Sequence, residues 1–433
     1  MTDPRTARAA GPKPAMRAFA ALLALALPLA PSLHADEYNS ARGFFIDLPE
    51  GYALVAGDGA ESFSFSSPDG TVQVDIRSYP ADRYRSVQTI ASETTKRLGA
   101  TGTPKYFRYA GRETALAELR FKLSADGYRG HALFVDGTPD RTVNGGGQDS
   151  GQSYDLVIIA YARERDYSAQ KDALLSVLDG FSADAAARNA PGPVGAEARA
   201  ALSASSPVKE ALINFGQAGV RVPWRPAEGA IAQATVEREY RVLVPYGAMP
   251  DLTVAAVRRF YRMVLRDSSP SLDLLALELA RAWDSAAWHS REPDGLSAAM
   301  PAQTAAPRFG PPADARAYAS ALLSWTQSWS YERSPAGSDV VNPLSAAMEG
   351  RGDCDSRALV LVALLRRENI RAILLVSLAH QHALAAIDAP GPGARFPYEG
   401  RGWLVAETTA KVGIGLIEQK QSSIADWFAV DFP

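Results

Sequence analysis

The 433-residue chain contains one cysteine, Cys354, directly after a Gly-Arg-Gly-Asp turn that begins at Gly350. A cysteine sulfur is a strong nucleophile, and a neighbouring imidazole and carboxylate can activate it for attack on an acyl carbon. His382 and Glu407 follow at the ends of apolar segments in the same part of the chain. These residue types predict a nucleophile, a general base and a carboxylate that orients the base.

The surroundings of Cys354 affect its reactivity in opposite directions. The apolar run that follows it predicts a buried helix with Asp353 as the N-cap. Backbone N–H groups and the positive dipole end of a helix lower the pKa of a thiol at its N-terminus. The charges of Asp353 and Asp355 oppose this effect, so we expect a histidine partner to be needed for activation.

Each supporting role has more than one candidate. His380 and His382 would lie on the same face of a strand, because side chains alternate with a period of two. Asp388 competes with Glu407 for the role of orienting carboxylate, although Asp388 lies at an Ala-Pro-Gly-Pro-Gly turn. His131, outside this region, is flanked by apolar residues and is interpreted as a hydrogen-bonded structural histidine.

A tetrahedral intermediate also needs hydrogen-bond donors for its oxyanion. The backbone N–H of Cys354 is one candidate, and the side chains of Trp329 and Gln327 are two others. The sequence has no cysteine pair, no His-x-x-x-His and no acidic calcium-loop pattern, so we expect neither a metal nor another cofactor.

The elements that position these residues follow from hydrophobic periodicity. Residues 315–332 have the pattern of an amphipathic helix, and Cys354 opens a second helix that is almost wholly apolar. Three strands are predicted by the apolar segments 370–378, 382–388 and 403–409. Strands that follow a buried helix can present the histidine and the glutamate at the N-terminus of that helix.

Residues 313–416 resemble the transglutaminase-like core. The resemblance rests on the Gly-x-Gly-Asp-Cys turn and its helix, the histidine that opens the strand HALAAI, the strand WLVAETT and the upstream aromatic residue Tyr331. It implies a papain-like helix packed on an antiparallel sheet. The activities that it implies are hydrolysis of amide bonds or acyl transfer from glutamine amides.

The resemblance also assigns roles to residues. Cys354 matches the nucleophile of the family, and His382 matches its base, in preference to His380, because the family's histidine opens its strand. Glu407 stands where the family has an aspartate, so its longer side chain must fold back to reach the imidazole.

The N-terminal half has a different pattern. Short segments of alternating polarity, separated by Pro- and Gly-containing turns, predict strands, and residues 86–100 predict a helix with Ser86 at its start and Gly99 at its end. A motif FIDLPEGY, an SPDG hairpin and a final helix ending in LDGF resemble a PsbP-like α/β sandwich. The glycine-rich stretch 145–151 is interpreted as a hairpin turn, because it lacks the context of a phosphate-binding loop.

Two further segments connect the halves. Residues 183–207 are rich in Ala, Pro, Gly and Ser and have linker composition, for which we expect an exposed, protease-sensitive connection. Beyond them, alternation predicts a strand at 234–246, and helical periodicity predicts helices at 253–267 and 271–288.

The first 35 residues are typical of a secretory signal, with a basic start, the apolar run 18–30 and the small residue Ala35 before a polar segment. We therefore expect a periplasmic or secreted protein, attached to a membrane only if the signal is not removed. A net charge of −3 does not favour nucleic acid as a partner.

The sequence thus predicts an α+β protein. Its expected parts are a signal peptide (1–35), a PsbP-like domain (36–182), a linker (183–207) and a transglutaminase-like domain with an N-terminal extension (208–433). The expected function is that of an exported cysteine enzyme, a protease-like hydrolase or acyltransferase, that acts on amide bonds of proteins or peptides, possible cell-envelope components among them. The alternative is a catalytically silent scaffold or binding module of the cell envelope.

Overall fold

The computed structural model describes residues 37–137, 153–216, 218–289, 314–335 and 337–433. The expected signal segment 1–35 and the stretch 145–151 lie outside these residues. The described chain combines helices with antiparallel sheets and is of the α+β class, as the sequence predicts. No helix in these ranges is both long and apolar enough to cross a membrane.

The N-terminal unit is built on a seven-stranded antiparallel sheet in the order β3-β4-β5-β9-β8-β7-β6. Its strands are β3 (Ala53–Gly57), β4 (Ser62–Ser66), β5 (Val72–Pro80), β6 (Lys105–Tyr109), β7 (Arg112–Leu123), β8 (Asp126–Val135) and β9 (Tyr154–Arg163). Side chains of β4 and β5 alternate between buried and half-buried positions, as the sequence pattern predicts. A small sheet of β1 (Tyr38–Asn39), β2 (Phe45–Ile46) and β10 (Phe181–Ser182) joins the two ends of this unit.

Two helices pack against the seven-stranded sheet, and each forms a separate apolar cluster with side chains of its strands. The first, α2 (Val87–Leu98), begins where Ser86 accepts a hydrogen bond from the Thr89 N–H and ends at Gly99, which has a φ of 60°. Both ends agree with the prediction. The second, α3 (Tyr167–Asp179), packs with the other cluster.

The segment 183–207 is folded, which corrects the expectation of an exposed connection. It contains the short 3-10 helix η1 (Ala186–Asn189) and the helix α4 (Pro193–Ala200). The carboxylate of Asp179 accepts hydrogen bonds from the N–H groups of Val194 and Gly195 at the start of α4. The segment has few large apolar groups, but backbone and charged contacts help to hold it in place.

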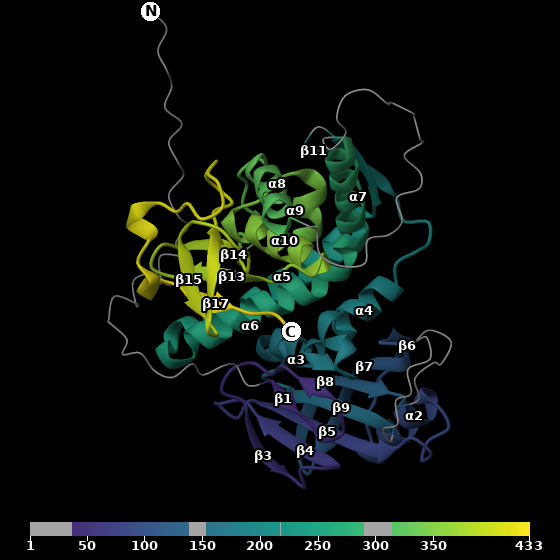
Figure 1. The fold of residues 1–433 in the computed structure, drawn as a ribbon. Helices are drawn as coiled ribbons and strands as arrows, with labels where there is room; N and C mark the ends of the chain where they lie inside the picture. The colour runs from purple at the N-terminus through teal and green to yellow at the C-terminus, as the bar shows by residue number, and fades with distance from the viewer. Residues whose placement is uncertain (1–36, 138–152, 217, 290–313, 336) are drawn as a thin grey trace, which may run out of the picture.

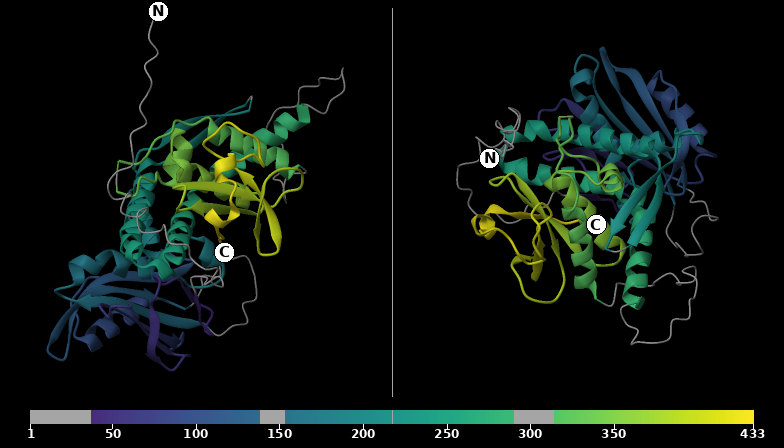
Figure 2. Two further views of the ribbon diagram at one scale, coloured as in Figure 1. Left: turned by 90° about the vertical axis from the view of Figure 1, so that its left-hand side faces the viewer. Right: turned by 90° about the horizontal axis from the view of Figure 1, so that it is seen from above.

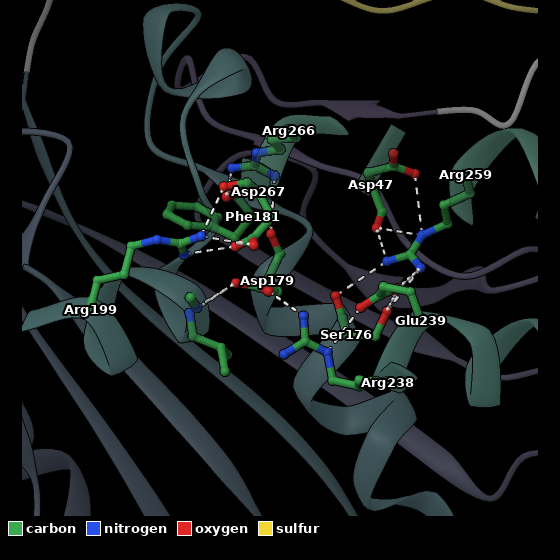
Figure 3. A network of polar contacts seen from close by, with 12 residues as sticks. Asp47, Ser176, Asp179, Phe181, Arg199, Arg238, Glu239, Arg259, Arg266 and Asp267 are labelled. Carbon is green, nitrogen blue, oxygen red and sulfur yellow. Dashed lines mark hydrogen bonds and ion pairs between the residues drawn. The ribbon is translucent and has the colours of Figure 1, made fainter. Parts of the chain in front are cut away.

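Buried charges join this segment and the N-terminal unit to the helices that follow (Figure 3). The Arg199 guanidinium forms two hydrogen bonds of 2.9 Å with the carboxylate of Asp267. Arg238 pairs with Asp179 and with Glu239. These side chains are at least four-fifths buried. Each charge has therefore lost its contact with water, and the ion pair with its partner compensates for that loss.

Two more arginines extend the network to backbone carbonyls. Arg259 donates to the carbonyl of Asp47 and to Glu239, and Arg266 donates to the carbonyls of Asp179 and Phe181. The N-terminal unit, the segment after it and the following helices are therefore held in one arrangement.

Removing Arg199 tests this arrangement. We expect Arg199→Met to lower the free energy of unfolding by about 3 to 5 kcal/mol, because Asp267 would remain buried without its partner. The matched control is Arg221→Met, which breaks an exposed pair with Glu210 and should cost less than about 1 kcal/mol. Urea unfolding followed by tryptophan fluorescence measures both values, and equal effects would contradict a network that locks the segment.

The middle of the chain contains a hairpin and three long helices. The hairpin consists of β11 (Lys209–Phe215) and β12 (Ala218–Trp224), and the helices are α5 (Pro226–Leu243), α6 (Pro250–Ser268) and α7 (Asp273–His289), with 3-10 turns η2 (Val244–Ala248) and η3 (Ser269–Leu272) between them. In Figures 1 and 2, the teal helices α5 and α6 lie between the N-terminal sheet and the green and yellow C-terminal part.

The strand predicted at 234–246 is wrong, because most of this segment belongs to α5. The buried residues Ala232, Val236 and Leu243 are spaced by four and seven positions, which places them on one face of a helix. Two charged side chains in this segment are nevertheless buried, because Arg238 pairs with Asp179 and Glu239 pairs with Arg238 and Arg259. The helices predicted at 253–267 and 271–288 are confirmed as α6 and α7.

The C-terminal part packs three helices, α8 (Ala315–Gln327), α9 (Pro343–Glu349) and α10 (Cys354–Arg367), with a five-stranded antiparallel sheet. The sheet order is β15-β16-β14-β13-β17. Its strands are β13 (Ala372–Ser377), β14 (His382–Ile387), β15 (Arg395–Tyr398), β16 (Arg401–Ala406) and β17 (Phe428–Val430), and the 3-10 turns η4 (Gln419–Gln421) and η5 (Ile424–Asp426) precede the last one. The apolar helix α10 packs on β13 and β14, as the buried-helix prediction requires.

Candidate active site

Cys354 is the first residue of α10, in agreement with the sequence. The Asp353 side chain caps this helix by accepting hydrogen bonds from the N–H and the hydroxyl of Ser356. Gly350 ends α9 in the left-handed conformation, with a φ of 62°, which reverses the chain before the cap. The Gly-x-Gly-Asp-Cys turn therefore brings the cysteine to a helix N-terminus.

The sulfur of Cys354 lies against the start of β14. Only 5% of the surface of this residue is exposed. The N–H of Ala383, the residue after His382, lies close enough to this sulfur to lower the pKa of the thiol. The thiol itself donates to the Asp355 carboxylate at 3.5 Å. The cysteine is thus placed beside the strand that carries the histidine, and it also contacts an anion.

The pKa of the Cys354 thiol lies well above its usual range. Burial is the largest cause, followed by the charges of Asp355 and Asp353, and the N–H of Ala383 offsets only part of their effect. Burial and the two adjacent carboxylates therefore outweigh the effect of the helix N-terminus. In the free protein the resting form is the neutral thiol.

This direction of the pKa predicts slow alkylation. The reactive species is the thiolate, so the rate with iodoacetamide should stay below that of an ordinary thiol of pKa about 8.5 and rise only at higher pH. The same protein unfolded in guanidinium should follow the ordinary profile. A high rate that persists at pH 6 in the folded protein would show a thiolate stabilised by imidazolium and contradict this expectation.

His382 and Glu407 form a close pair. The imidazole Nε2 lies 2.8 Å from Glu407 Oε2, and both side chains are about nine-tenths buried. His382 opens β14 and Glu407 directly follows β16, the neighbouring strand, so the register brings them together. The longer side chain of glutamate does reach the imidazole, as the sequence analysis required.

The second oxygen of Glu407 is also held in place. Oε1 accepts hydrogen bonds from the N–H of Thr409 at 2.7 Å and from its hydroxyl at 2.6 Å. Burial raises the pKa of Glu407, but its bonds to His382 and Thr409 outweigh burial and hold the pKa below its usual value. The carboxylate is therefore charged at neutral pH, and Nε2 of His382 carries the proton that it accepts. Nδ1 is then the nitrogen that remains free to accept a proton.

His380 has a different setting from the one expected. It lies in the turn between β13 and β14, not on a strand, and its Nε2 is 3.2 Å from Asp426. Because the turn breaks the period-two relation, His380 and His382 do not share a strand face. The pairing with Glu407 distinguishes His382 as the candidate base.

Asp388 is separated from His382 along β14. It follows the far end of the strand, where it pairs with Arg401 at 3.0 Å and with Arg371 at 3.4 Å. The structure therefore brings Glu407, and not Asp388, to the imidazole.

His131 has the setting of a structural histidine. It is buried, its ring nitrogen Nε2 lies 3.0 Å from the Tyr167 hydroxyl, and burial lowers its pKa to about 4.

The two candidate oxyanion side chains differ. Both hydrogens of the Gln327 amide are engaged, because Nε2 donates to the carbonyls of Glu407 and Val412 at 2.7 and 2.9 Å. Gln327 therefore supports the segment around Glu407, and its assignment as an oxyanion donor is corrected. The indole Nε1 of Trp329 is buried and has no hydrogen-bond partner among the described residues, so it stays a candidate donor.

Arg357 ties the site together and was not singled out from the sequence. Its buried guanidinium donates to the carbonyls of Gly352, Trp329 and Thr408. These carbonyls belong to the turn before Cys354, to the end of the α8 region and to the segment that follows Glu407. Tyr331, the aromatic residue expected near the cysteine, is half exposed beside the same guanidinium. In the sequence, only the position of Arg357 one helical turn after Cys354 could have suggested that it supports the site.

Within the described ranges, no group of three or more His, Cys, Asp or Glu side chains is arranged to hold a metal ion. Cys354, His382 and Glu407 have the groups that nucleophilic attack and proton transfer require.

Comparison with known proteins adds little to the geometry. No protein-family model and no curated protein matches the chain. Among solved structures, the chain is similar to LpqN, which is involved in cell envelope biogenesis of Mycobacterium tuberculosis, with 13% identity over 31% of this chain and 79% of that one, and a TM-score of 0.23. A protein from Bacteroides thetaiotaomicron shows 9% identity over 55% of this chain and 80% of its own, also with a TM-score of 0.23. These scores are too low to indicate a shared fold, so neither likeness bears on function.

Proposed function

We propose that this protein is an exported cysteine enzyme that attacks amide carbonyls through Cys354, with His382 as base and Glu407 as the residue that orients it. The observation that carries the proposal is the buried His382–Glu407 pair, whose histidine opens the strand that lies against Cys354. The order of these residues and their elements resembles the transglutaminase-like core, and the N-terminal sheet with its helices resembles a PsbP-like domain.

The reaction proceeds through a thioester. The Cys354 sulfur bonds to the substrate carbonyl carbon while its proton passes to Nδ1 of His382. Glu407 stabilises the imidazolium, and the backbone N–H of Cys354 with the free indole N–H of Trp329 are the donors available for the oxyanion. The carbon–nitrogen bond then breaks as His382 protonates the leaving amine.

The second half of the reaction removes the acyl group. Water attacks the thioester as His382 accepts its proton, which releases a carboxylic acid and restores the neutral thiol. An amine in place of water would form a new amide, which is acyl transfer. Transfer of the proton during attack suits a thiol of raised pKa, because no resting thiolate is required.

We further propose that the first 35 residues direct the chain to the periplasm or the exterior, and that proteins or peptides, cell-envelope components among them, are the substrates. The charge balance of the chain supports neither nucleic acid nor anionic lipid as a partner. The packed segment 183–207 favours a fixed rather than a flexible placement of the PsbP-like unit beside the catalytic unit.

A second candidate function is a catalytically silent scaffold or binding module. The burial of Cys354 and the contact of its thiol with Asp355 favour this candidate, because a sealed thiol does not need to react.

Acylation by a small activated ester separates the two functions. With 4-nitrophenyl acetate, an enzyme should release a burst of nitrophenolate equal to one equivalent of protein, since the thioester forms faster than it hydrolyses. Cys354→Ala should abolish the burst and leave the slow background. A burst of the same size in this variant, or none in the wild-type protein, would favour the scaffold.

A further inference from the structure

A cavity of about 150 Å³ adjoins His382 on the side that faces α5 and α6. Its walls come from these two helices, from the segment before α9 and from the end of β13 with the turn that follows. The cavity thus lies between the middle helices and the strands of the candidate site.

Most of the wall surface is apolar, and it includes one carboxylate. The apolar part consists of Leu243, Val257, Phe260, Val340, Val376 and Leu378. Asp355, which directly follows the nucleophile, is the only Asp, Glu, Lys or Arg among the lining residues that the structure describes. No lysine or arginine in the described ranges lies within ion-pair distance of it.

The two oxygens of Asp355 have different environments. Oδ1 accepts a hydrogen bond of 2.5 Å from the Tyr261 hydroxyl, which fixes the carboxylate. Oδ2 is 3.5 Å from the Cys354 sulfur, whose thiol is its only hydrogen-bond donor in the described part of the chain. A half-buried carboxylate that lacks a cation is unfavourable, and a ligand that carries a cation would remove that cost.

The position of Oδ2 restricts which cation can fit. In an amino acid, the α-nitrogen and the carbonyl carbon are about 2.5 Å apart, since two bonds join them. An attacked carbonyl lies about 3 to 3.5 Å from the nucleophile. An α-ammonium group hydrogen-bonded to Oδ2 therefore allows its own carbonyl to meet the sulfur, whereas a lysine ε-ammonium is several bonds too far from its carbonyl.

The cavity also suits the rest of such a residue. Apolar cavities of about 150 Å³ hold a molecule the size of benzene, which matches the side chain of leucine or phenylalanine. A bound ammonium group would also offset the charge of Asp355 beside the sulfur, and so favour loss of the thiol proton when substrate is present.

We infer that Asp355 binds the free α-ammonium group of the substrate and that the adjoining cavity holds its apolar side chain, so that the enzyme acts on the carbonyl of an apolar N-terminal residue. The inference rests on the proposed function and specifies its substrate class. Asp355 is thereby a specificity-determining residue, and hydrolysis would release one free amino acid from the N-terminus of a peptide.

Affinity labels of defined charge test the inference with the full chain. Leucyl chloromethyl ketone carries a free α-amine, and its N-acetyl derivative has the same side chain without the charge. We expect the free amine to modify Cys354 about 100-fold faster, because the acetylated label leaves the Asp355 charge unpaired. Intact mass measured against time supplies the rate constants.

Two variants and a third label complete the test. Asp355→Asn keeps an acceptor for Tyr261 but loses the charge, and it should bring the two rates to within a few-fold of each other. Asp388→Asn, a paired carboxylate at the far end of β14, should retain the wild-type ratio. Nα-acetyl-lysyl chloromethyl ketone, whose only amine is on the side chain, should react as slowly as the N-acetyl derivative of the leucyl label.

Each outcome has one meaning. Equal rates for the free and acetylated leucyl labels in the wild-type protein would overturn the inference and leave the proposed function intact. Fast reaction of the lysyl label would replace α-ammonium recognition by side-chain recognition and overturn it as well. Failure of every label to modify folded Cys354 would overturn the proposed function itself. The wild-type ratio decides these cases even if Asp355→Asn does not fold.

Discussion

His382→Ala is expected to lower the rate of Cys354 acylation by 4-nitrophenyl acetate by about 10³-fold or more. The neutral thiol must lose its proton as it attacks, and the imidazole that accepts the proton would be gone. The raised pKa of Cys354 makes this dependence stronger, since little thiolate exists at neutral pH without help. The initial rate of nitrophenolate release measures the effect.

His380→Ala is the matched control for this variant. It removes an imidazole two residues away that pairs with Asp426 in the turn before β14. We expect its acylation rate to stay within a few-fold of the wild type, once circular dichroism shows that both variants are folded. Equal losses of acylation rate in the two variants would mean that both disturb the turn before β14, and that His382 does not act as a base.

Glu407→Gln is expected to lower the same rate by about 10²-fold, less than the loss of the histidine. The amide has a single acceptor oxygen, so it cannot accept from both Nε2 and the Thr409 N–H as the carboxylate does, and it cannot stabilise the imidazolium by charge. With that oxygen facing Nε2, the amide nitrogen can donate to the Thr409 hydroxyl but not pair with the Thr409 N–H, so circular dichroism must first show that the variant is folded. An unchanged rate in a folded Glu407→Gln variant would reduce the glutamate to a structural partner.

Local patterns were sufficient to predict several elements. Ser86 and Gly99 bound α2 as their capping preferences indicate, and the apolar run after Cys354 forms the buried helix α10. The strand expected at 234–246 failed because Arg238 and Glu239 are buried. Polarity alone assigns such residues to an exposed face, whereas pairing with Asp179 and Arg259 allows both to be inside.

The segment 183–207 shows the same limit of composition. Its small residues indicate a linker, but α4 is held by Asp179 and Asp267, which come from helices on either side of it in sequence. Charged contacts between distant residues carry no local pattern, so composition alone could not predict a folded connection.

The site itself was partly predictable. The order of Cys354, His382 and Glu407 and the elements that carry them follow from spacing and polarity, and the pairing of the last two is present. The direction of the Cys354 pKa was not predictable, because it is the balance of burial and nearby carboxylates against helix N–H groups. The roles of Gln327 and Arg357 depend on which carbonyls surround them, and that requires the three-dimensional structure.

The most direct test of a nucleophilic Cys354 is to locate the acyl group after brief reaction with 4-nitrophenyl acetate. The protein is quenched in acid and digested, and the peptides are analysed by mass spectrometry. We predict one acetyl group per chain on the peptide that contains Cys354, removed by hydroxylamine as a thioester is, and absent from His382→Ala at the same reaction time. An unmodified Cys354 in a folded protein whose acetyl groups all lie on lysines would contradict the account.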